Sequence, residues 1–241
     1  MQLVTGSKDK YKLSAQGGYK HLEEDLHRLS PEWSSLVWPL QPGSDPDDAF
    51  SSVPYEKGFA LLAYLESLVG EPAFKEFVRA YVQAFKFSTV TSGQFRDFFC
   101  GFFGGRPDLL ALDWVALFTA QGLPQHPLVD LSNPLADAAG SLVSRVAEFD
   151  LAPPASVVDL SALPSIQSWS TDQKTLFLDK LLDQASTSPL RELTLIKLNQ
   201  VYGLNSVRNA EIKFRWQMVC LKSSVPWYVR MYICIYVANL I

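Results

Sequence analysis

The strongest constraint on the fold is an apolar stripe of helical period between residues 72 and 87. Its large side chains recur three, four, seven and eleven residues after the first: Phe74, Phe77, Val78, Tyr81 and Phe85. This spacing puts them on one face of an α-helix. Pro72 stands at the first turn, where the missing N–H has no cost. We therefore predict an amphipathic helix that packs along this face.

Capping patterns indicate further helix starts. Thr91 with Gln94, and Ser170 with Gln173, have the spacing of a capping box and precede apolar runs. Asn205 is expected to cap a later helix. The apolar face of that later helix comprises Ile212, Trp216, Val219 and Cys220.

The remaining patterns favour an all-α chain. Sustained β-type alternation is absent apart from Ser35–Leu40, where Pro39 limits a strand to an edge or to an extended connection. The later helices, joined by turns such as Ser186–Pro189, suggest the paired helices of an α-solenoid.

A proline-rich stretch divides the chain. Residues 122–134 hold three prolines and no helical period, a composition typical of an extended linker. We place a helical domain at residues 1–121 and a second at 135–222. The final residues, 223–241, form a distinct apolar tail.

The tail leaves three interpretations open. Val225–Ile241 is apolar and aromatic except at Arg230 and Asn239. As a helix it would rise about 25 Å, short of the roughly 30 Å hydrocarbon core, with Arg230 near its middle. A buried terminal helix or strand is therefore favoured over a membrane span. A third interpretation is a non-native end with an aggregation-prone face.

Charge and cysteine content narrow the function classes. A net charge of −4 without a dense Lys/Arg run gives no footprint for nucleic acid or anionic lipid. The three cysteines, Cys100, Cys220 and Cys234, are odd in number and widely spaced, which favours reduced, packed thiols. Residues 1–13 lack a signal-peptide core. We therefore expect a cytoplasmic protein without a nucleic-acid partner.

Motifs for several chemistries are missing. The histidines His21, His27 and His126 form no H-E-x-x-H, so a self-contained zinc site is not expected. All three are predicted to lie at the surface. The sequence also lacks a phosphate-binding loop, a G-x-G-x-x-G motif and a G-x-S-x-G elbow.

The most unusual segment is Pro42–Gly58, P-G-S-D-P-D-D-A-F-S-S-V-P-Y-E-K-G, an acidic loop that runs into a helix near Tyr55. Its aspartates could simply complement the helix dipole or close Asx turns. Alternatively, a phenol at a helix start can donate a hydrogen bond to a developing oxyanion. Spacing alone does not choose between these interpretations.

Three segments together resemble the leukotriene A-4 hydrolase and aminopeptidase B branch of the M1 zinc aminopeptidases. They are Ser51–Leu65 (S-S-V-P-Y-E-K-G-F-A-L-L-A-Y-L), Phe74–Phe87, and Arg208–Trp216 (R-N-A-E-I-K-F-R-W). Asp45–Asp48 is more similar to aminopeptidase B, and the following run to the leukotriene hydrolase. The resemblance implies the helical tail of a thermolysin-like catalytic domain followed by an ARM-like α-α solenoid.

The resemblance also implies site residues. Tyr55 matches the tyrosine that polarises the scissile carbonyl, and Asp47 matches a substrate-binding aspartate. Phe50 replaces a pocket tyrosine, a departure that weighs against epoxide hydrolysis. The narrow apolar part of the substrate channel is implied to be lined by Pro46, Ala49, Val53 and Pro54.

The family's zinc motif and its amine-gripping G-x-M-E-N are absent, and the resemblance places them before Met1. The family's final basic residues are likewise replaced by the apolar tail. We therefore expect a C-terminal fragment of a zinc metallo-aminopeptidase, which releases N-terminal residues from peptide substrates and for which leukotriene A-4 hydrolysis is a further activity to consider. The fragment alone is expected to bind no zinc and to be inactive. The alternative is a non-catalytic helical module that binds a protein partner.

Overall fold

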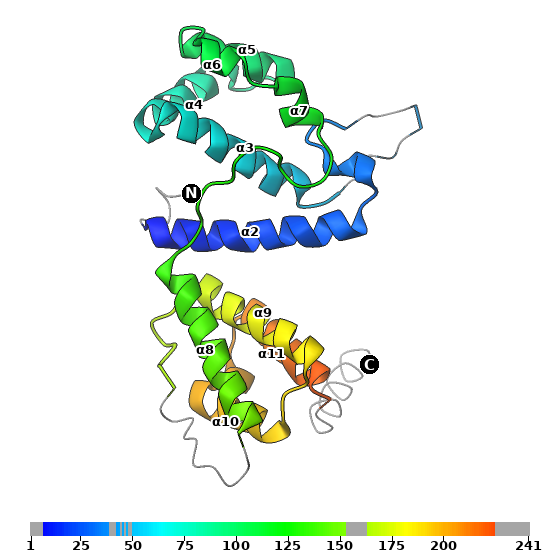
Figure 1. Cartoon of the computed structure of the whole chain (residues 1–241), viewed down its shortest axis with the longest axis vertical. Coiled ribbons are helices and arrows are strands. Elements are labelled where there is room, and N and C mark those ends of the chain that lie inside the picture. The colour runs from blue at the N-terminus through cyan, green and yellow to red at the C-terminus, as the bar shows by residue number, and fades with distance from the viewer. Residues whose placement is uncertain are drawn as a thin grey trace. The chain divides into compact units, whose positions relative to one another are not determined.

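The computed structural model describes residues 7–38, 42–43, 45, 47, 50–152 and 163–224. Within these ranges all regular secondary structure is helical and no strand occurs, which confirms the predicted fold class (Figure 1). Ser35–Val37 forms bends and Trp38 is irregular, so neither is part of a strand, and Pro39 and Leu40 lie outside the described residues. The described residues form two compact units, one within Ala15–Leu131 and the other within Met1–Ser14 and Ser132–Ile241.

The first unit is built from short and medium helices. Gly70, with φ of 86°, provides the sharp connection between α3 and α4, because a left-handed φ suits glycine. Chain order gives α2 (Lys8–Arg28), whose first residues count with the second unit, then η1 (Pro31–Ser34), α3 (Val53–Val69), α4 (Glu71–Phe85), α5 (Ser92–Phe102), α6 (Pro107–Leu110) and α7 (Trp114–Thr119).

Phe77 lies at the centre of the aromatic core of this unit and is 1% exposed. The predicted stripe is confirmed, although Val78 lies at its margin and is 41% exposed. Edge-on and tilted ring contacts of this kind add to area burial. The rings with centroids 5.0 to 6.0 Å from that of Phe77 belong to Phe74, Tyr81, Phe95, Phe98, Phe99, Phe102 and Phe103.

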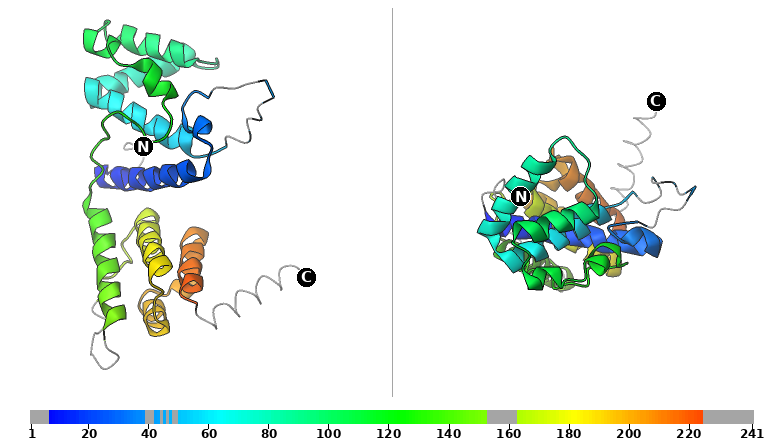
Figure 2. Two further views of the ribbon diagram at one scale, coloured as in Figure 1. Left: turned by 45° about the vertical axis from the view of Figure 1, so that its right-hand side comes forward. Right: turned by 90° about the horizontal axis from the view of Figure 1, so that it is seen from above.

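The second unit contains α8 (Pro134–Leu151), α9 (Thr171–Thr187), α10 (Glu192–Tyr202), η4 (Leu204–Ser206) and α11 (Ala210–Lys222). Helix α9 packs against α8 and α11, and these three helices lie side by side (Figure 2). Phe177, Leu181 and Trp216 are at most 1% exposed in the core between them. Helix α8 begins at Pro134, the last residue of the predicted linker.

The predicted helix caps are confirmed in two cases and wrong in one. Thr91 and Gln94 form a complete capping box. Ser170 caps α9, but the Gln173 side chain donates to the Leu135 carbonyl, 3.0 Å away. Asn205 does not cap α11.

Asn209 caps α11 instead, and its side chain accepts the N–H groups of Glu211 and Ile212 at 3.0 and 3.2 Å. The reason is local: Asn205 lies in the 3₁₀ turn η4, and the chain is extended at Val207 before α11 begins. The Asn205 side chain accepts a hydrogen bond from the Trp216 indole at 2.7 Å.

Two polar groups join the ends of α8 and α10. The buried Asp150 carboxylate accepts the Arg191 N–H at 2.8 Å and the Thr194 hydroxyl at 2.6 Å, at the start of α10. In return the Arg191 guanidinium donates to the carbonyls of Phe149 and Ala152, at the end of α8. Asp150 therefore pairs with the N–H that precedes α10, and Arg191 adds donors to carbonyls at the end of α8.

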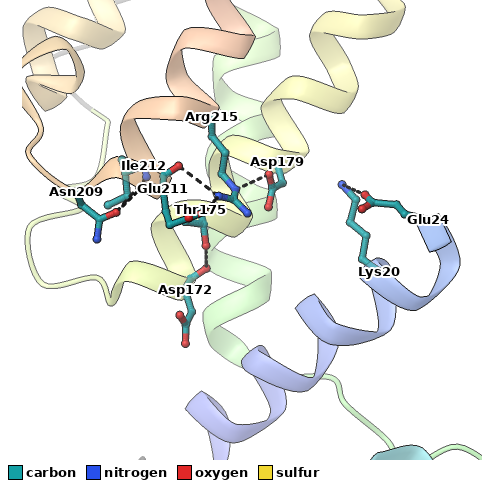
Figure 3. A network of polar contacts seen from close by, with 9 residues as sticks. All are labelled: Lys20, Glu24, Asp172, Thr175, Asp179, Asn209, Glu211, Ile212 and Arg215. Carbon is teal, nitrogen blue, oxygen red and sulfur yellow. Dashed lines mark hydrogen bonds and ion pairs between the residues drawn. The ribbon is translucent and has the colours of Figure 1, made fainter. Parts of the chain in front are cut away.

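Arg215 on α11 forms an ion pair with α9. Its guanidinium pairs with Asp179 at 2.8 Å and with Glu211, four residues earlier, at 2.6 Å (Figure 3). In the first unit, Lys20 and Glu24 form an i, i+4 pair at 4.0 Å (Figure 3).

The expectations for the cysteines and for the apolar tail are tested only in part. Cys100 and Cys220 are free and buried, as predicted, while Cys234 lies outside the described residues. Among the helices in the described ranges, none is both long and apolar enough to cross a bilayer. Val225–Ile241 also lies outside these ranges, so its three interpretations stay open.

Candidate functional site

The acidic loop leads into α3 through local turns. The Asp45 carboxylate accepts the N–H of Asp47 at 2.9 Å, which is an Asx turn. The Asp47 carbonyl then accepts the N–H of Phe50 at 3.1 Å. One aspartate of the loop thus has the structural role that the sequence left open, whereas the Asp47 side chain is exposed.

Tyr55 is the third residue of α3 and is 69% exposed. Its N–H donates to the Ser52 carbonyl at 3.0 Å, so its backbone belongs to the first helical turn. Within the described part of the chain its hydroxyl has no hydrogen-bond partner. A phenol hydroxyl is therefore presented at a helix N-terminus, the end that favours negative charge.

The last turn of α2 holds the start of α3. Asp25 accepts the Ser52 N–H at 2.6 Å and pairs with Arg28 at 2.9 Å. Arg28 also donates to the Phe50 carbonyl at 3.5 Å. Burial raises the pKa of Asp25, but the hydrogen bonds from Ser52 and Arg28 outweigh burial and hold the pKa below its usual range.

Lys57 lies on the opposite side of α3 from Tyr55 and is 3% exposed. Its ammonium donates to the carbonyls of Ser34, Ala120 and Gly122 at 2.9, 2.5 and 2.8 Å. Burial lowers the pKa of Lys57 to about 8. Three carbonyl dipoles oppose this effect, because only the protonated amine has three N–H groups to donate.

A cavity of about 290 Å³ lies beside the same turn, between α2, α3 and residues 128–131. Its walls, which include Tyr19 and Phe59, are mainly apolar, and Glu56 contributes a carboxylate. Burial raises the pKa of Glu56, an effect that a Coulombic contribution from His21 opposes. The carboxylate lies directly against Gly18, where the Cβ of any larger residue would come within 1.9 Å of it.

The remaining predicted site residues differ in how far they are buried. Val53 is fully buried, whereas Pro54 is exposed and Phe50 is 77% exposed. Pro46 and Ala49 lie outside the described residues. Phe50 is hydrogen-bonded to Asp47 through its N–H and to Arg28 through its carbonyl. Arg28 pairs with Asp25, which accepts the Ser52 N–H at the start of the turn that carries Tyr55. The roles of all these residues stay predictions.

The histidines do not gather into a site. His21 and His27 are exposed, as predicted. His126 was predicted to be solvated, but it is half-buried because its ring stacks on Tyr64, with centroids 4.8 Å apart and planes 14° apart. Across the described ranges, no three His, Cys, Asp or Glu side chains are grouped so that they could hold a metal ion.

Sequence reasoning missed Asp25 and Lys57. The signal for Lys57 was present, because it stands four residues after Val53 and four before Leu61, on the buried stripe of α3. A lysine at a core position predicts either a buried partner or a set of carbonyl acceptors. Asp25 had no comparable signal, since its partner Ser52 is 27 residues away.

Two family profiles match separate parts of this chain. Residues 6–104 match the profile described as "Peptidase family M1 domain". Residues 169–232 match the profile "Leukotriene A4 hydrolase, C-terminal". The chain is therefore similar to the M1 peptidase family, in its leukotriene A-4 hydrolase branch, over both matched parts. The predicted resemblance is confirmed.

Named relatives agree with this family. Leukotriene A-4 hydrolase of Xenopus laevis is 35% identical over 219 residues, which cover 87% of this chain and 34% of the relative. Leucine aminopeptidase 2 of Sclerotinia sclerotiorum is 35% identical over 205 residues, which cover 83% of this chain and 32% of the relative. The chain spans about a third of the length of these M1 relatives.

Solved structures show the same fold. Yeast leukotriene A-4 hydrolase in complex with bestatin matches with a TM-score of 0.79 and 25% identity, over 95% of this chain and 39% of the other. The native enzyme from Saccharomyces cerevisiae matches with a TM-score of 0.80 and 27% identity, over 93% of this chain and 38% of the other. The chain therefore has the fold of an M1 catalytic-domain tail and a helical C-terminal domain.

Proposed function

We propose that this chain forms the C-terminal part of an M1 aminopeptidase and supplies Tyr55 to its active site. Tyr55 donates a hydrogen bond to the oxyanion that develops when water attacks the scissile peptide carbonyl. The observation that carries this proposal is the exposed Tyr55 in the first turn of α3, whose hydroxyl has no partner among the described residues, inside the segment that matches the M1 domain.

The position of Tyr55 suits this chemistry. A donor contributes most when it is fixed before the charge develops. The turn that carries Tyr55 is held by Asp25 on one side and by Lys57 on the other. The neighbouring helix N-terminus adds a favourable dipole for an anion.

Asp47 and Phe50 define the substrate in this proposal. The exposed Asp47 carboxylate pairs with a basic side chain at the N-terminus of a peptide. Phe50 presents a ring without a hydroxyl, so it cannot position water by a hydrogen bond. The substrate class is therefore short peptides with a free N-terminus, rather than a lipid epoxide.

The zinc of the family does not fit the described residues. The sequence has no H-E-x-x-H, and the described residues contain no candidate metal cluster. The proposal assigns the metal and the general base to residues outside this sequence. The 241-residue chain alone is expected to lack peptidase activity and stoichiometric zinc.

A hybrid enzyme tests the function. This chain would replace the matching C-terminal region of the Xenopus laevis leukotriene A-4 hydrolase, and hydrolysis of arginine and alanine p-nitroanilides would be measured. We expect the hybrid to cleave both substrates and the isolated chain to cleave neither. A well-folded, zinc-loaded hybrid without activity, or an active isolated chain that contains zinc, would contradict the proposal.

Variants of the hybrid assign the roles. Tyr55→Phe should lower kcat roughly 100- to 1,000-fold with little change in KM, because the donor acts mainly in the transition state. Tyr64→Phe, which removes another hydroxyl from α3 and keeps the ring, is the matched control and should be near wild type. Asp47→Asn should raise KM for the arginine substrate more than for the alanine substrate.

A further inference from the structure

Lys57 occupies a position where an apolar side chain would be expected. It lies on the inward stripe of α3 between Val53 and Leu61, both of which are at most 5% exposed. Burying an ammonium costs free energy unless its hydrogen bonds are satisfied. No carboxylate pairs with it in the described part of the chain, so its bonds to carbonyls must compensate for the lost water.

Those bonds gather three points of the backbone. The Ser34 carbonyl lies at the end of η1, and the carbonyls of Ala120 and Gly122 follow α7. These three acceptors are 23, 63 and 65 residues from Lys57 in the sequence. The Ser34 hydroxyl also accepts the Gly122 N–H at 2.8 Å. Lys57, Ser34 and Gly122 therefore form a closed set of hydrogen bonds.

This arrangement is directional in a way that apolar packing is not. A methionine in the same space could fill the volume, but it would not define the rotation of α3 about its axis. Three N–H groups aimed at three fixed carbonyls define both that rotation and the position of the helix along its axis. Tyr55 lies two residues earlier, about 200° around the helix. A helix rotation that directs Lys57 into the core therefore directs Tyr55 toward the solvent.

We propose that Lys57 is a positioning residue, whose ammonium fixes the first turn of α3 against Ser34, Ala120 and Gly122 and thereby sets the direction of the Tyr55 side chain. The inference rests on the proposed function of Tyr55 and adds a residue to it. Asp25 holds the backbone entrance of the same turn, whereas Lys57 sets its rotation.

The first test observes Tyr55 in the 241-residue chain itself. The protein is labelled with 3-fluorotyrosine, and the ¹⁹F signal of Tyr55 is assigned by its loss in Tyr55→Phe. Lys57→Met should shift or broaden this signal. Lys75→Met, which removes a partly exposed lysine paired with Glu71 on α4, is the control and should leave it unchanged.

Amide hydrogen exchange separates positioning from general support. In Lys57→Met, exchange should accelerate roughly tenfold or more at residues 53–57 and 120–122, while the amides of α5 around Phe99 stay protected. An unchanged Tyr55 signal, or acceleration spread evenly over residues 15–131, would overturn the proposal.

Chemical rescue keeps the test decisive if Lys57→Met does not fold. Lys57→Ala removes three methylenes and the ammonium, which n-propylammonium can replace. Added n-propylammonium should restore the Tyr55 signal, whereas 1-propanol, of similar size but neutral, should not. Absence of rescue, or equal rescue by the alcohol, would overturn the proposal. Because no activity is measured, failure of this test and failure of the peptidase assay are distinguishable.

Discussion

At the scale of single residues, the candidate site depends on polar groups that come from distant parts of the sequence. Tyr55 and Asp47 lie in one continuous, unusual segment, and the resemblance to the M1 family singled them out within it. The groups that hold this segment could not be picked out from the sequence, because Asp25 and the carbonyl acceptors of Lys57 come close to it only in the folded chain. Asn205 illustrates the same limit: its residue type suits a cap, but it lies in a 3₁₀ turn, and Asn209 caps α11 instead.

The hydrogen bond from the Ser52 N–H to the Asp25 carboxylate should make a pH-dependent contribution to the free energy of unfolding. Folding holds the pKa of Asp25 below its ordinary value of 3.8, so the contribution is full above that value and is lost as pH falls through the folded pKa. Asp25→Asn should lower the free energy of unfolding by about 1 kcal/mol at pH 7. Urea titrations at pH 7 and pH 3 should show the difference shrinking at the lower pH.

Asp97→Asn is the matched control, because Asp97 forms an exposed pair with the adjacent Arg96. It should change stability little at either pH. If Asp25→Asn lowers the free energy of unfolding equally at both pH values, the charge of Asp25 does not contribute to stability.

At the scale of helices, periodicity predicted the elements well and their ends less well. The stripe from Phe74 to Phe85 and the cap at Thr91 are local signals, and both are confirmed. The joined ends of α8 and α10 depend on Asp150 and Arg191, which are 41 residues apart, and neither residue type is unusual at a helix end.

Removing one member of that pair should be costly. Asp150→Ala leaves the Arg191 N–H and the buried Thr194 hydroxyl without their acceptor, so it should lower the free energy of unfolding by roughly 2–4 kcal/mol. Arg191→Met should cost less, because the carbonyls it leaves can reach water more easily. Denaturant unfolding of both single variants and the double variant should give a coupling energy above about 0.5 kcal/mol. Additive losses would show that the two caps act independently.

Helix α2 should be open to stabilisation at Gly17. A Cβ at this position would meet no atom within 4 Å, and the residue is helical. Gly17→Ala should therefore raise the free energy of unfolding by about 0.5–1 kcal/mol. Gly203→Ala is the contrasting control, since φ of 63° at Gly203 makes a side chain unfavourable and should lower stability. Thermal unfolding of both variants would check the opposite signs.

At the scale of the whole molecule, each unit carries a buried cysteine. Cys100 lies in the first unit and Cys220 in the second. Burial raises the pKa of Cys100, and burial raises the pKa of Cys220 to about 12. Both thiols are therefore inaccessible and largely protonated at neutral pH. All-α character and the linker composition were readable from the sequence, whereas whether the two units unfold independently was not.

Pulsed alkylation in urea should measure that stability unit by unit. In a Cys234→Ser background, both thiols should react slowly without denaturant, because the reactive thiolate is rare and covered. If the predicted linker at 122–134 separates two domains, Cys100 and Cys220 should become reactive at different urea concentrations. Mass spectrometry of the two cysteine peptides gives both midpoints in one experiment. A single shared midpoint would mean that the units unfold together.

The close approach of Glu56 to Gly18 limits which residues can replace Gly18. A glycine inside a helix costs stability, yet at residue 18 it leaves the space that the Glu56 carboxylate fills. A larger residue at position 18 is tolerated only if the side chain at position 56 moves away or becomes shorter. The atoms in the way are the far end of a flexible side chain, so Gly18→Ala would displace the Glu56 carboxylate and thereby change the lining of the cavity beside α3.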